Sequence, residues 1–267
     1  MKAFKYETII SDILRGNMEN LDSFLRSGGQ VDLRNPRNQQ TLLMSAVQNG
    51  YFKDEAIINL LLKHGANLEA TCDLGYTPLM YAAMHTDGEP NFLKLLIKKG
   101  ANIEYTTSRG NVLTVALSRA TSKIADALVE FDFNVKLFET ENFSPLSFAC
   151  FNGNLNVAQK LLEKGASVNG EHLNFSYQNK GECVPPIWAC LRGICYSGDC
   201  TIEIFNLLTQ SNADPTICDR DGMGIQDYIK RTMRNIDLPP AFHAYYDRWT
   251  LHSQTKASEL NRTKPRL

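Results

Sequence analysis

Four cysteines in the C-terminal third of the chain are the residues closest to a chemical site. They follow the spacing C-x6-C-x4-C-x4-C and are Cys183, Cys190, Cys195 and Cys200. Structural zinc sites are usually built from paired cysteine knuckles, which this segment lacks. We therefore expect no bound metal and no cofactor. Zinc held by these thiols, and a Cys195–Cys200 disulfide in an oxidising compartment, stay open as alternatives.

Known catalytic motifs do not occur in this sequence. It contains no G-x-S-x-G, no H-E-x-x-H, no G-x-x-x-x-G-K and no G-x-G-x-x-G. Cys183 and His172, with a nearby carboxylate, could form a nucleophile pair, but they lie in a poorly constrained insertion. We expect that the protein is not an enzyme. An enzymatic or metal site in the region 170–200 is the alternative.

A helix–turn–helix unit repeats along the chain and must position any functional residues. In one copy, Ser144 and Pro145 favour a helix start, and Gly165 favours the turn that ends the second helix. The helix ends recur as LLLKHGANL at 60–68 and LLIKKGANI at 95–103. Helix starts at positions 41, 77, 111 and 144 lie 36, 34 and 33 residues apart. Such a period indicates a repeat architecture.

Together, these motifs resemble the ankyrin repeat family over roughly residues 5–230. The resemblance implies an α-helical solenoid of about six to seven helix-turn-helix units with β-hairpin-like fingers. We expect an ankyrin repeat domain over 1–252, with an N-terminal capping repeat at about 5–36 and a C-terminal capping helix at about 240–252. Residues 253–267 are polar, and we expect a disordered tail there.

Two departures from the family pattern affect the expected packing. The histidine that usually follows the helix start is replaced by Met80 in one repeat and by Ser147 in another. The resemblance therefore does not imply, at these positions, the hydrogen bond that this histidine makes in the family. Phe131, Asp132 and Phe133 stand where the other repeats have a Lys-Gly-Ala turn, so we expect this repeat to be locally looser.

Charge and hydropathy narrow the classes of partner and the compartment. Lys and Arg number 28 against 29 Asp and Glu, a net charge of −1. Nucleic-acid binding needs an excess of positive charge, so we expect no nucleic-acid partner. Since no apolar run approaches a membrane span and the N-terminus lacks a signal-like apolar region, we expect no membrane insertion. We predict a cytoplasmic protein, of the producing cell or of a host cell if translocated, and a monomer when free.

In the ankyrin family, the finger tips and the exposed side of the inner helices form one concave wall, which implies protein binding here. Tyr76, Met84, Phe143 and Phe151 are large apolar groups at wall positions, where aromatic residues often dominate binding. Phe148 falls on the core side of the same helix as Phe151. Alternatively, Phe143 packs against its own finger and Phe151 turns into the core.

The predicted function is therefore binding of one partner protein on the concave face, as an inhibitor or immunity-type protein or as an adaptor. A translocated bacterial effector that binds a host protein is the alternative. A purely structural spacer would instead have a polar concave face. The lengthened finger at 171–180 and the other wall positions complete the site. The candidate partner-binding residues are Arg37, Asn38, Gln40, Gln48, Asp73, Tyr76, Met84, His85, Ser118, Arg119, Glu141, Phe143, Phe151, Asn152, Phe175, Tyr177 and Arg192.

Overall fold

A computed structural model describes residues 6–48, 55–84, 90–107, 110–118, 122–140, 143–170, 184–197, 201–218, 221–224, 227, 240–241, 243–249 and 251. Helices dominate these residues, in the order α1 (Tyr6–Leu14), α2 (Met18–Arg26), α3 (Leu42–Gln48), α4 (Ala56–Lys63), α5 (Pro78–Ala83), α6 (Asn91–Lys98), α7 (Val112–Ser118), α8 (Ser122–Val129), the 3-10 helix η1 (Val135–Phe138), α9 (Pro145–Phe151), α10 (Leu155–Glu163), α11 (Pro186–Ser197) and α12 (Thr201–Gln210). Extended pairing in this part of the chain is confined to isolated antiparallel bridges. The chain divides into two compact units, residues 1–134 and 135–267.

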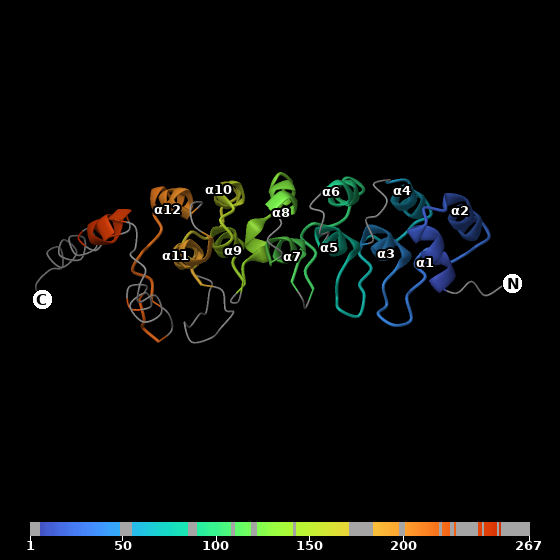
Figure 1. Ribbon diagram of the computed structural model, residues 1–267, viewed down its shortest axis with the longest axis horizontal. Coiled ribbons are helices and arrows are strands. Elements are labelled where there is room, and N and C mark those ends of the chain that lie inside the picture. The colour runs from blue at the N-terminus through green and yellow to red at the C-terminus, as the bar shows by residue number, and fades with distance from the viewer. Residues whose placement is uncertain are drawn as a thin grey trace, which may run out of the picture. The chain divides into compact units, whose positions relative to one another are not determined.

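Unit 1, residues 1–134, consists of stacked helix pairs (Figure 1). The inner helices α1, α3, α5 and α7 pack in succession, and each carries an outer helix, α2, α4, α6 or α8. Leucines from both layers are fully buried, among them Leu42 of α3, Leu61 of α4 and Leu96 of α6. Because each pair leaves an apolar face uncovered, the core forms only when neighbouring pairs stack.

Unit 2, residues 135–267, contains η1 and two further pairs, α9 with α10 and α11 with α12. The inner helices α9 and α11 pack against each other, and so do the outer helices α10 and α12. A helical segment at 243–249 contacts the last pair: the Tyr245 hydroxyl donates to the Ala213 carbonyl at 2.8 Å, and its ring meets Phe205 edge-on. This contact agrees with a capping role, while the predicted domain boundaries stay predictions.

Side-chain caps define the four helix starts expected from the sequence. Thr41 accepts a hydrogen bond from the Met44 N–H, Thr77 accepts one from the Met80 N–H, and Ser144 does the same for Ser147. At the equivalent position Asn111 uses its amide oxygen to accept from the Thr114 N–H, at 2.9 Å. Each cap satisfies a backbone N–H that has no partner inside its helix, so these residue types select where the helices begin.

The turn after each outer helix explains both the regular repeats and the irregular one. Gly65, Gly100 and Gly165 all have a positive φ, between 84° and 98°, which a residue with a side chain rarely adopts. The fourth repeat lacks this glycine, and α8 instead leads to η1. Val135 and Phe138 of η1 are fully buried. The segment that follows the irregular turn is therefore well packed, while the expected looseness of this repeat stays a prediction.

A series of hydrogen bonds joins successive fingers inside each unit. Each bond runs from a backbone N–H to a side-chain oxygen of the preceding finger. In unit 1, Asp32 accepts from the Asn67 N–H at 3.1 Å. Glu69 accepts from the Asn102 N–H, and Glu104 from the Asn134 N–H, both at 2.7 Å. In unit 2, Glu139 accepts from the Ser167 N–H at 2.6 Å, and Asn169 accepts from the Asp214 N–H at 2.7 Å. Side-chain oxygens, four of them from acidic residues and one from Asn169, thus hold the stack together where the finger backbone would otherwise lack partners.

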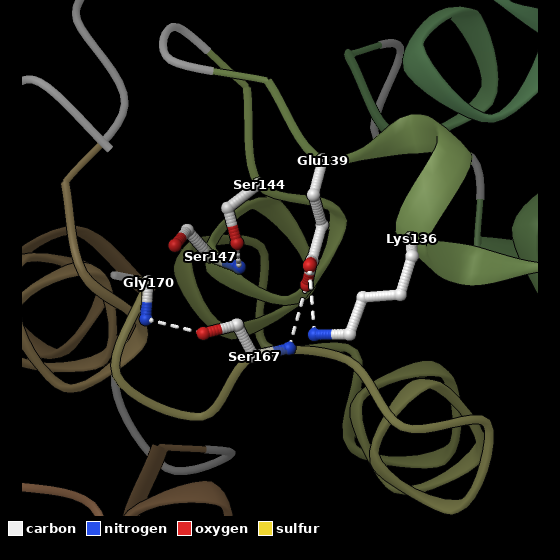
Figure 2. A network of polar contacts seen from close by, with 6 residues as sticks. All are labelled: Lys136, Glu139, Ser144, Ser147, Ser167 and Gly170. Atoms are coloured by element: carbon white, nitrogen blue, oxygen red, sulfur yellow. Dashed lines mark hydrogen bonds and ion pairs between the residues drawn. The ribbon is translucent and has the colours of Figure 1, made fainter. Parts of the chain in front are cut away.

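Figure 2 shows the junction formed by Glu139. The Glu139 side chain is only 5% exposed, and its second oxygen forms an ion pair with Lys136 at 2.9 Å. Ser167, which donates its N–H to Glu139, also accepts the Gly170 N–H through its hydroxyl at 3.0 Å. Glu139 therefore connects η1 to the finger that follows α10.

Candidate functional site

Two neighbouring fingers of unit 1 are fastened to each other by backbone-directed hydrogen bonds. The Arg34 guanidinium donates to the carbonyl of Gln39 in its own finger and to that of Thr71 in the next, at 3.0 and 2.8 Å. The Asp73 N–H donates to the Asn38 carbonyl at 3.1 Å. Residues at these finger tips are consequently held in place before any partner arrives, which lowers the entropy lost on binding.

Beneath the fingers, a polar and aromatic row links the inner helices α3 and α5. The Gln40 amide donates to the Gln48 side-chain oxygen at 2.9 Å. The Tyr81 hydroxyl lies 3.4 Å from the Cys72 thiol, and its ring meets Tyr76 edge-on at 6.0 Å. Burial, followed by the Cys72 hydrogen bond, raises the pKa of Tyr81, so its hydroxyl stays protonated at neutral pH.

Most of the described candidate residues of unit 1 reach the surface. Arg37, Gln48, Asp73 and Ser118 are exposed, while Asn38, Tyr76 and Met84 are partly buried. Leu74, a further wall position of the same finger, is 48% exposed between Asp73 and Tyr76.

Gln40 requires a correction. It was expected to face a partner, but only 9% of it is exposed. Its amide is directed at Gln48, and it also hydrogen-bonds the Tyr81 hydroxyl. Gln40 therefore positions the surface residues around it and does not present its own side chain.

In unit 2 the two phenylalanine predictions have opposite outcomes. Phe151 is 39% exposed at the end of α9, as expected. Phe143 is only 8% exposed, so its expected exposure is wrong. Its backbone pairs with Thr140 in a tight finger, which turns the ring onto Phe148, with ring centroids 5.0 Å apart. Phe148 is correspondingly only partly buried, and the fully buried core positions of α9 are Leu146, Ala149 and Cys150.

Asn152, at the end of α9, is partly buried. Several other candidates cannot be placed. Arg192 lies in α11, but its side chain is not among those described. The candidates outside the described residues are His85, Arg119, Glu141, Phe175 and Tyr177. Cys183 and Cys200 also lie outside, so the structure does not test the spacing of the four cysteines. Among the described residues, no three His, Cys, Asp or Glu side chains come together as metal ligands.

The described buried thiols belong to the packing. Cys150 and Cys190 are fully buried, as expected for small apolar residues of inner helices. Burial raises the pKa of the Cys190 thiol to about 12, so it stays protonated and unreactive at neutral pH.

Comparison with known proteins places this arrangement in a family. Models of the ankyrin repeat family match residues 11–107 as three copies and residues 141–172 as one further repeat. The chain is built from ankyrin repeats. Its fold is the ankyrin solenoid, and ankyrin repeats are typically protein-binding modules without enzymatic activity. A helix able to span a membrane would have to be longer and more apolar than any in the described part of this chain.

Solved ankyrin repeat domains share the fold. The domain of Bcl-3, a member of the IkappaB protein family, matches with a TM-score of 0.61 and 22% identity, covering 81% of this chain and 91% of that one. The human ASB11 domain matches with a TM-score of 0.60 and 21% identity, covering 87% and 98%.

Curated relatives match over part of the chain. A probable E3 ubiquitin-protein ligase of Oryza sativa subsp. japonica, XBOS32, is 30% identical over 158 residues, 58% of this chain and 30% of that protein. The Caenorhabditis elegans ankyrin repeat and KH domain-containing protein mask-1 is 31% identical over 112 residues, 41% of this chain and 4% of that protein. The chain thus spans less than a third of either relative.

Proposed function

We propose that the chain binds one partner protein through the inner face of unit 1, formed by Asn38, Gln48, Leu74, Tyr76 and Met84. The observation that carries this proposal is the pair of linked fingers, which present Leu74 and Tyr76 in a fixed arrangement. Leu74 is 48% exposed, so its burial against a partner would remove apolar surface from water, which favours binding. A preformed apolar centre with a polar rim is the usual composition of a protein-binding hot spot.

The polar side chains around this centre give the site orientation. The Gln48 side-chain oxygen accepts a hydrogen bond from the Gln40 amide N–H. Because Gln48 remains exposed, its own amide N–H can still donate a hydrogen bond to a partner. Arg37 and Asp73 are exposed on neighbouring fingers and carry opposite charges. The face therefore selects a partner that presents an apolar side chain flanked by polar groups, rather than one of uniform charge.

The test is a matched pair of charge insertions. Leu74→Asp places a charge in the inner face, while Leu137→Asp places one at an equally exposed leucine of η1, 53% exposed and outside this face. Affinity purification with mass spectrometry identifies the partner of the wild-type chain, and titration then compares the variants. We expect Leu74→Asp to weaken binding by about tenfold or more, a loss of about 1.4 kcal/mol, and Leu137→Asp to leave it unchanged. Equal binding by both variants would place the partner elsewhere.

Binding in this way would mask or position the partner. An inhibitor or immunity-type protein, or an adaptor, is the role we favour, because rigid docking needs no chemistry from the chain. A translocated effector is the alternative, and the source of the captured partner distinguishes them: a protein of the producing cell supports the first and a host protein the second. Ligase activity, named for the rice relative, is not proposed for this chain, which spans 30% of that protein.

A further inference from the structure

A cluster of lysines lies on the outer helices of unit 1, away from the inner helices that carry the proposed site (Figure 1). Lys94, Lys98 and Lys99 belong to α6 and its C-terminal cap, and Lys63 ends α4 at the position equivalent to Lys98. All four are exposed. Within the described residues, none of them forms an ion pair or a side-chain hydrogen bond. We call these four residues the lysine strip.

In two other repeats, those of α2 and α10, the equivalent positions are internally paired. Two and six residues before the turn glycine, α2 has Asp22 and Arg26, which form an ion pair at 2.7 Å. In α10 the same positions hold Gln159 and Glu163, which hydrogen-bond at 3.2 Å. In α6 they hold two lysines, Lys94 and Lys98. Like charges four residues apart on a helix repel each other. Lys94 and Lys98 therefore do not stabilise α6 as the pairs in α2 and α10 stabilise those helices, and they leave α6 with an excess of positive charge.

The charges of the neighbouring helix limit which kinds of ligand can bind to the lysine strip. α8, the next outer helix in the row, carries Lys123 and Asp126, and Glu130 follows its end, so the excess of positive charge does not continue along the row. The strip is therefore narrower than the positive field that a membrane or a nucleic-acid backbone would need. The whole chain has a net charge of −1 and offers no wider positive field. Charge complementarity on this scale suits a short acidic segment.

We propose that the lysine strip is a second docking surface, which binds an acidic segment of a partner protein. The strip supplies charge complementarity and faster association. Because the strip involves none of the inner-face residues, this inference does not depend on the function proposed above.

The test uses the full chain and a fluorescein-labelled deca-glutamate peptide, with binding followed by fluorescence anisotropy at low and physiological salt. We expect the wild-type chain to bind the peptide and to lose affinity as salt rises. Lys94→Glu with Lys98→Glu should weaken binding by about tenfold or more at low salt. The neutral pair Lys94→Gln with Lys98→Gln should fall in between. Thermal unfolding of both pairs checks that they fold.

The matched control reverses the same number of charges on α10, by Lys160→Glu with Lys164→Glu. Lys160 is already paired with Glu163 at 3.3 Å, so this change should leave peptide binding within about twofold of wild type. An equal loss in the control would show that only net charge matters and would overturn the proposal. So would failure of the wild-type chain to bind the peptide, or tighter strip-dependent binding to phosphatidylserine vesicles or to an oligonucleotide. The Leu74→Asp variant should bind the peptide normally, which keeps this test separate from that of the inner face.

Discussion

Replacing Glu139 by alanine removes the side chain that joins η1 to the following finger in unit 2. The deletion leaves the Ser167 N–H without the acceptor that it contacts at 2.6 Å. Hydrogen bonds to charged groups contribute about 1.5–3 kcal/mol, and an unpaired buried donor adds a desolvation penalty of similar size. The ion pair with Lys136 adds little, because that lysine is 55% exposed and the attraction is screened. We therefore expect Glu139→Ala to lower the free energy of unfolding by about 2 kcal/mol.

Urea unfolding followed by far-UV circular dichroism measures this loss as a shift of the midpoint at unchanged slope. Lys136→Ala is the control, since it removes the ion pair and keeps the acceptor for Ser167; it should cost less than about 1 kcal/mol. Glu139→Gln keeps a neutral acceptor and should fall between the two. If Glu139→Ala is no more destabilising than Lys136→Ala, the carboxylate does not hold the finger, and the role assigned to these junctions is wrong.

Three further predictions concern the core and the caps of unit 2. Ser147→Ala should be neutral or stabilise the fold by up to about 1 kcal/mol, because the buried Ser147 hydroxyl has no hydrogen-bond partner among the described residues. Ser144→Ala should instead cost about 1 kcal/mol, because it removes the helix cap. Chemical denaturation compares the two variants. Phe143→Ala should cost about 3 kcal/mol and Phe151→Ala less than about 1 kcal/mol, and similar melting temperatures for both would contradict the burial described above. Cys190 should react with iodoacetamide at pH 8 only after unfolding, because its raised pKa keeps the thiol protonated; peptide mass spectrometry of native and unfolded protein checks this.

Local sequence was sufficient to predict the repeats, because each signal acts over a few residues. Ser144 caps the N–H of Ser147 three residues later, and Gly165 takes the positive φ that ends its helix. Such interactions are made inside one unit, so they can be recognised without knowledge of its neighbours. The family assignment and the solenoid followed from their repetition at a nearly constant period.

Side-chain direction at the fingers was decided by tertiary structure. Phe143 and Phe151 were both assigned to the concave wall, yet Phe143 is 8% exposed and packs on Phe148, while Phe151 is 39% exposed. Gln40 is buried where it hydrogen-bonds the Tyr81 hydroxyl of α5, the next inner helix of the stack. A repeat pattern specifies the positions of backbone segments, but the exposure of each side chain depends on contacts between segments that are far apart in the chain.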